Sequence, residues 1–139
     1  MAAWARTQAT HDDTITVGAF GVRFLVEAAD SNGTAAVFEC SVPANARMPA
    51  PHSHDGFEET IYGLTGVTTW TIDGQRVEIA AGEAVCVRGG QIHGFQNHGS
   101  VDATFLAIAT PGVSDPTTSA RSARFSPPAG RRTWPPSPR

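Results

Sequence analysis

The sequence predicts an all-β fold, and three observations support this prediction. Short β-prone runs follow one another at a spacing of roughly 8–12 residues, which is typical of a β-sandwich or barrel. The 139-residue chain contains 14 glycines and 10 prolines, which favour turns between strands over a helix bundle. No segment of useful length shows helical periodicity. The length of the chain and its hydrophobic content of 40% indicate one domain with a modest core.

The β-prone runs predict about eight or nine strands, because each run is bounded by glycine, proline, asparagine or aspartate. Asp73-Gly74 lies between two of the runs and is a strong signal for a two-residue β-hairpin turn. In chain order, the runs cover residues 14–17, 22–28, 35–42, 60–64, 65–72, 77–79, 84–87, 92–97 and 103–110.

The chain is expected to have three parts. Residues 1–13 are polar and predict a flexible N-terminus. Residues 14–112 contain all the strand-like runs and form the folded domain. Residues 113–139 contain six prolines, many serines and threonines, and almost no aliphatic side chain. This composition predicts a disordered Pro/Arg-rich C-terminal tail.

Charge and composition argue against nucleic-acid and membrane partners. Residues 1–112 hold 5 Arg and 12 acidic residues, a net charge of about −7, which gives no reason to expect nucleic-acid binding. The tail holds 5 Arg and 1 acid, but these charges are scattered and predict a solvated segment. The chain lacks an apolar run of about 18 residues and an N-terminal signal-peptide core, so we expect a cytoplasmic protein.

The two cysteines do not suggest redox or structural chemistry. Cys40 and Cys86 lie 46 residues apart in apolar runs, a spacing that fits neither a disulfide framework nor a zinc pair. We expect both to be small buried hydrophobic residues.

The segment PHSHDGFEET, residues 51–60, contains a candidate metal site. On a strand, His52 and His54 would project from the same face, so their imidazoles could share one ion, and a carboxylate often completes such a site. An unbroken strand would place Glu58 on that face. However, Asp55-Gly56 is a turn signal, and a turn or bulge shifts the register by one residue and favours Glu59. The local pattern leaves both acids open.

A third histidine lies in a distant run. In residues 82–97, His93, Phe95 and Asn97 alternate on one predicted strand face, after a glycine-rich turn. If this strand crosses near the first segment, the three histidines can meet and a site with three or four ligands is expected.

The two segments together resemble the motifs of the cupin superfamily. The first motif requires H-x-H, then a glutamate followed by six residues and a glycine. Glu59 meets this spacing with Gly66, whereas the same count from Glu58 ends on Thr65. The second motif is matched by Gly82, Gly90, His93 and Asn97. The chain departs from the family pattern at Ala46, Arg88, Gly63 and Thr65, which are turn or wall positions and remove no ligand.

The resemblance implies a double-stranded β-helix, or jelly-roll barrel, with a metal site inside it. It implies that His52, His54, Glu59 and His93 bind one divalent ion, and such a donor set suits Fe, Mn, Ni, Co or Zn. A homodimer is also expected by resemblance, since pairing would cover exposed strand edges.

The expected function is that of a metal-dependent, quercetinase-like dioxygenase acting on a small enolic or aromatic substrate. Glu59 would act as the catalytic base, and Phe57, Phe95 and Asn97 are candidate substrate-pocket residues. Two alternatives remain: a redox-neutral metal-dependent isomerase or lyase, and a cupin that binds a small molecule without catalysis.

Overall fold

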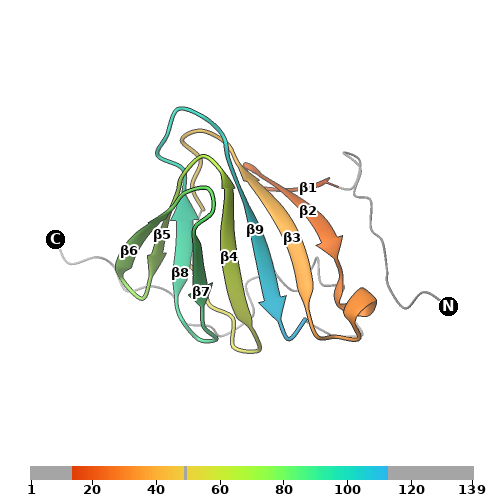
Figure 1. The fold of residues 1–139 in the computed structure, drawn as a ribbon. Coiled ribbons are helices and arrows are strands. Elements are labelled where there is room, and N and C mark those ends of the chain that lie inside the picture. The colour runs from red at the N-terminus through yellow and green to blue at the C-terminus, as the bar shows by residue number, and fades with distance from the viewer. Residues whose placement is uncertain (1–13, 49, 113–139) are drawn as a thin grey trace.

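The computed structural model describes residues 14–48 and 50–112, and this part of the chain is built almost entirely of β-strands (Figure 1). One short 3-10 helix, η2 (Ala28–Ser31), lies in the connection between the second and third strands and was not predicted. The strands are β1 (Thr14–Val17), β2 (Phe20–Val26), β3 (Ala36–Val42), β4 (Glu58–Thr65), β5 (Thr68–Ile72), β6 (Gln75–Ile79), β7 (Ala84–Val87), β8 (His93–Gln96) and β9 (Ala103–Thr110).

The strands form two antiparallel sheets, which confirms the predicted all-β jelly-roll fold class. The larger sheet has the order β1-β2-β3-β9-β4-β7, and the smaller has the order β6-β5-β8. Strand β9 therefore lies between β3 and β4, although it follows them by many residues (Figure 1). Within the described ranges, no helix is long and apolar enough to cross a membrane.

The core lies between the two sheets and follows from strand alternation, since successive side chains on a strand point to opposite faces. Every second residue of β3 and of β9 is buried. Trp70 of the smaller sheet packs against Phe105 of the larger one, with ring centroids 5.2 Å apart. Phe95 stacks on Trp70 at 4.7 Å. The core is thus rich in aromatic rings where the two sheets meet.

The Asp73-Gly74 turn has the conformation that the sequence predicted. Both residues have positive φ, +46° and +83°, and they connect β5 to β6 with Ile72 opposite Gln75. A two-residue hairpin of this kind requires positive φ at both central positions, which aspartate tolerates and glycine adopts freely.

The predicted strand through His52 and His54 is wrong. His52 makes one isolated bridge to His93, and Arg47 makes another to Gln96. Between these two bridges the chain advances five residues on the first segment, from 47 to 52, but only three on the second, from 96 to 93. The first segment therefore bulges out of regular pairing. The predicted turn at Asp55-Gly56 is present as a bend, and β4 begins two residues later.

The expectation that both cysteines are buried holds for one of them. Cys40 is buried in β3, but Cys86 is exposed on β7, which among the described strands is an edge strand paired with β4 alone.

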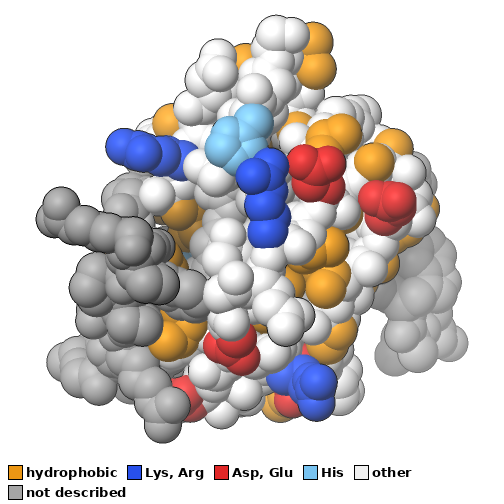
Figure 2. Space-filling view, turned by 90° about the vertical axis from the view of Figure 1, so that its left-hand side faces the viewer, with side chains coloured by type: hydrophobic (Ala, Val, Ile, Leu, Met, Phe, Trp, Pro, Cys, Tyr) orange, Lys and Arg blue, Asp and Glu red, His pale blue; other side chains and the backbone are white. Residues whose placement is uncertain are grey.

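On the side where β5 and β6 lie, acidic and basic side chains are interspersed and form no patch of one sign (Figure 2). The predicted flexible N-terminus and the Pro/Arg-rich tail lie outside the described residues.

Candidate metal centre

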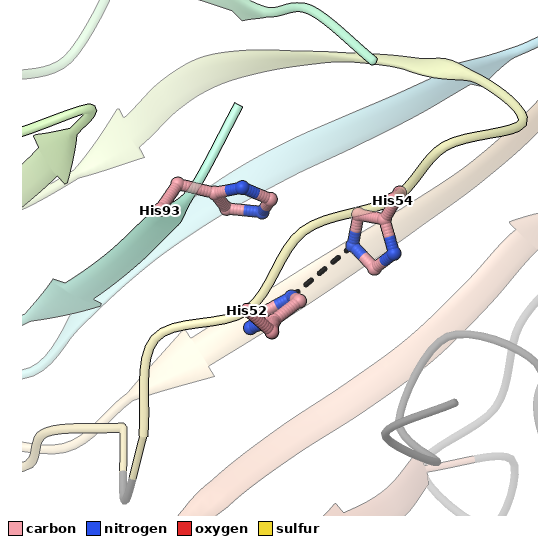
Figure 3. A group of neighbouring side chains, drawn as sticks. All are labelled: His52, His54 and His93. Carbon is pink, nitrogen blue, oxygen red and sulfur yellow. Dashed lines mark hydrogen bonds between the residues drawn. The ribbon is translucent and has the colours of Figure 1, made fainter. Parts of the chain in front are cut away.

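Three histidines from two segments that are distant in sequence meet inside the fold (Figure 3). His52 and His54 come from the segment before β4, and His93 is the first residue of β8. One nitrogen from each ring can be chosen so that all three lie within 4.8 Å of one another. His54 and His93 are buried and His52 is partly buried, so the cluster is largely shielded from water.

Backbone pairing places two of these rings side by side. The N–H of His52 donates to the carbonyl of His93 at 2.9 Å, and the N–H of His93 donates to the carbonyl of His52 at 2.8 Å. This reciprocal pair brings the ring centroids to 4.5 Å. The His52–His93 bridge, although isolated, therefore brings the two sequence motifs together.

His52 and His54 face each other through their Nε2 atoms, which are 3.1 Å apart. Two imidazole lone pairs at this distance repel, so a proton or a cation is needed between them. Glu59 approaches the same nitrogen of His54, with its Oε2 atom 3.4 Å from His54 Nε2. A cation at this point would be attracted by both the nitrogens and the carboxylate.

His93 has its tautomer set by the backbone. Its Nδ1 lies 3.0 Å from the carbonyl oxygen of Gln91, which can only accept a hydrogen bond. Nδ1 therefore carries the proton, and in the neutral ring Nε2 keeps its lone pair for a ligand. This is the arrangement found in metal-binding histidines.

The two neighbouring glutamates have different surroundings. Glu59 is 8% exposed and lines the cavity between the two sheets. Its paired residues on the neighbouring strands are Ala109 of β9 and Val87 of β7. Glu58 is exposed, and its Oε2 atom accepts a hydrogen bond from the N–H of Gly89. Glu59 stands beside the three histidines but outside the group of atoms within 4.8 Å of one another. The donor set of three imidazoles with an adjacent carboxylate fits a divalent transition metal.

A small cavity adjoins the cluster and has about 20 Å³ of free space, which is room for roughly one water molecule. Trp70 lies nearly parallel to His93 with ring centroids 6.3 Å apart. The walls are mostly aromatic or sulfur-containing: Phe38, Cys40, Met48, His52, His54, Glu59, Trp70, His93, Phe95 and Phe105 line the cavity.

The candidate pocket residues occupy three different kinds of position. Phe95 lines the cavity, and Phe57 stacks on His54 with ring centroids 4.6 Å apart. Asn97 does not line it. The Asn97 amide donates to the carbonyls of Val42 and Val101 and accepts from the N–H of Gly99, so it ties the end of β3 to the loop between β8 and β9.

Cys40 is a cavity residue that the sequence did not single out for the site. Burial raises the pKa of its thiol far above the ordinary value, and the carboxylates of Glu59 and Glu39 raise this pKa further. The thiol is therefore neutral and serves as an apolar wall rather than as a thiolate ligand. Strand alternation alone could have placed Cys40 and Phe38 on one face, but not opposite the histidines.

The Cupin_2 family, described as a cupin domain, matches residues 38–109, about half of the chain. The chain belongs to this family. The match includes all three histidines and Glu59. No curated protein matches this cupin significantly.

Three solved structures illustrate the similarity. The polyketide cyclase RemF from Streptomyces resistomycificus is 26% identical, with a TM-score of 0.64, covering 79% of this cupin and 79% of RemF. A predicted oxalate decarboxylase from Thermotoga maritima is 25% identical, with a TM-score of 0.62, covering 66% of this chain and 80% of the other. KdgF from Halomonas sp. is 14% identical, with a TM-score of 0.66 and coverage of 80% and 98%, a likeness of fold alone.

Proposed function

We propose that this cupin is a metal-dependent enzyme acting on a small enolic or aromatic substrate. The observation that carries the proposal is the cluster of three histidines, with a buried carboxylate beside it, at an aromatic-lined cavity. His52, His54 and His93 would hold one divalent ion of Fe, Mn, Ni, Co or Zn, and Glu59 would join them. When bound, the metal supplies Lewis-acid stabilisation of an oxyanion.

The residues around the cluster suit proton abstraction from an acidic substrate. Glu59 is buried and acceptor-only when ionised, so it can take a proton from an enolic O–H or an activated C–H. The aromatic walls exclude water, which strengthens every charge interaction at the site. Met48 and Phe95 are only partly buried, and both line the cavity, so they are the walls that would shift to admit a substrate larger than water.

In the first form of the proposal the reaction consumes O₂, as in a dioxygenase that cleaves flavonols or β-diketones. The test is O₂ uptake by the Fe(II)-loaded protein with a panel of flavonols and β-diketones. We expect uptake that His93→Ala abolishes and that His98→Ala, a change at an exposed histidine outside the cluster, preserves. Uptake no greater than that of His93→Ala across the whole panel would contradict the oxygenase form.

In the second form of the proposal the reaction is redox-neutral, and the names of two similar solved structures support it. The two solved structures at 25–26% identity carry the names of a cyclase and a predicted decarboxylase, and neither name describes an oxygenase. This form predicts product from polyketide-like β-polyketones or β-keto acids with Zn(II) under anaerobic conditions. Turnover that persists without O₂ selects the redox-neutral form, whereas turnover that stops selects the oxygenase form.

A further inference from the structure

One peptide group links the β5–β6 turn to the metal cluster. The carbonyl of the Gln91–Ile92 peptide accepts the hydrogen bond from His93 Nδ1 at 3.0 Å. The N–H of the same peptide group, on Ile92, donates to Asp73 Oδ1 at 2.9 Å. A carboxylate, a peptide and an imidazole are therefore connected in series.

We propose that Asp73 is a positioning residue for His93, acting through the Gln91–Ile92 peptide. The hydrogen bond to the carboxylate polarises the peptide and makes its carbonyl a stronger acceptor. The stronger acceptor holds the proton on Nδ1 and leaves the Nε2 lone pair directed at the cluster. As far as metal binding is concerned, the inference rests on the proposed function.

Other hydrogen bonds fix the same peptide in place. Asp73 Oδ2 accepts from Gln91 Nε2 at 3.1 Å, and the Asp73 N–H donates to the Ile92 carbonyl at 2.8 Å. Gln91 also closes the turn before β8, because its Oε1 accepts from the N–H of Arg88 at 2.8 Å. The hairpin turn and the turn before β8 therefore hold the Gln91 carbonyl at one position relative to the imidazole.

The identity of residue 73 supports this role. The turn requires positive φ followed by glycine, and asparagine satisfies that requirement at least as well as aspartate. Asparagine, however, offers one acceptor oxygen, whereas both oxygens of Asp73 accept hydrogen bonds. The turn alone does not explain a carboxylate here, but the contacts to Gln91 and Ile92 do.

The expected loss of metal affinity on substituting Asp73 can be judged from other residues that hydrogen-bond to metal-bound histidines. Losing such a residue typically weakens metal binding about 10–100-fold. Asp73 is exposed, and it acts through a peptide rather than on the imidazole directly. We therefore expect the lower end of the range, about tenfold.

The experiment compares Asp73→Asn with Asp102→Asn. Asp102 is a matched control because it is exposed and its Oδ1 also accepts a backbone N–H at 3.0 Å, but from Ala44 in the connection between β3 and β4. Two readouts are measured: Co(II) affinity with the visible Co(II) spectrum, and the imidazole ¹⁵N shifts of His93 in metal-free protein. Asp73→Asn/Gln91→Glu serves as a rescue variant, since the amide introduced at position 73 can then donate to a carboxylate oxygen at position 91.

We expect Asp73→Asn to weaken Co(II) binding about tenfold and to alter the spectrum and the His93 ¹⁵N shifts. Asp102→Asn should match the wild type, and the double variant should recover part of the loss. Equal Co(II) affinity and equal His93 shifts in Asp73→Asn and Asp102→Asn would overturn the inference. If the wild type binds no Co(II), the proposed function fails, and the ¹⁵N comparison in metal-free protein still decides the role of Asp73.

Discussion

Glu58 and Glu59 are adjacent in the chain, yet strand β4 turns them to opposite faces of the larger sheet. Glu59 points inward beside His54, and Glu58 points outward, where it accepts a hydrogen bond from Gly89. The row of residues paired across the sheet at Glu59 includes Ala109 and Ala36, whose small side chains leave space beside the carboxylate. The two acids therefore have different surroundings despite their similar chemistry.

We predict that Glu59→Gln lowers the metal content of the protein and that Glu58→Gln leaves it unchanged. Glu59→Gln is isosteric and removes the negative charge next to His54, whereas Glu58 lies at the surface. Metal content after reconstitution and dialysis, measured by elemental analysis, checks this prediction. An empty site in Glu58→Gln together with a full site in Glu59→Gln would reverse the assignment.

For single residues, the sequence predicted the candidate metal-binding side chains better than the side chains that surround them. The motif spacing identified His52, His54 and His93, which the structure brings together. Trp70 and Cys40 were not assigned to the cavity, because a period-two pattern shows which residues share a face but not what that face meets. The hydrogen bond from His93 to Gln91 likewise depends on a turn geometry that spacing does not specify.

Strand β4 also has a position where its backbone meets another segment closely. A Cβ atom on Gly63 would lie 2.1 Å from the carbonyl oxygen of Ala80. The N–H of Gly63 donates to the Glu83 carbonyl, and its own carbonyl accepts from Gly82, each at 2.9 Å. This glycine docks the turn between β6 and β7 against β4, and any side chain would separate them.

We predict that Gly63→Ala destabilises the fold by about 1–3 kcal/mol, the usual cost of forcing extra volume into a packed site. Gly56→Ala is the matched control, since a Cβ there would meet nothing within 4 Å. Urea unfolding followed by circular dichroism gives the free energy of unfolding for both variants. Equal stability of the two would show that the β6–β7 turn can move aside without cost.

For the molecule as a whole, the histidine cluster lies where the two sheets meet. His52 and His54 belong to the connection from β3 to β4 of the larger sheet, and His93 belongs to β8 of the smaller one. An ion bound to all three would cross-link the sheets, and any ligand that binds only the folded state stabilises it.

We therefore predict that a divalent metal raises the melting temperature and that a chelator reverses the rise. At a free metal concentration of 100 times Kd, the gain in unfolding free energy would be about 2.7 kcal/mol. Differential scanning calorimetry with Zn(II), Co(II) and Ni(II) measures the shift. His93→Ala should show no metal-dependent shift, whereas His98→Ala should show that of the wild type; a shift of equal size in His93→Ala would exclude the cluster as its cause.

The overall architecture was predictable to a different degree at each level. Alternating apolar runs predicted the strands, and two spaced motifs predicted the family. The insertion of β9 between β3 and β4 is a long-range pairing that no local pattern reveals. The irregular backbone at His52 and the exposure of Cys86 escaped prediction for the same reason, because both depend on which strands become neighbours.

The central place of β9 has a consequence for biosynthesis. When β3 and β4 have left the ribosome, the strand that joins them has not yet been translated, and both present open hydrogen-bonding edges for a few seconds at ordinary elongation rates. The larger sheet cannot close until residues 103–110 are free of the exit tunnel. Ribosomal pausing before β9 would prolong this exposure, and we expect it to increase aggregation of the nascent chain.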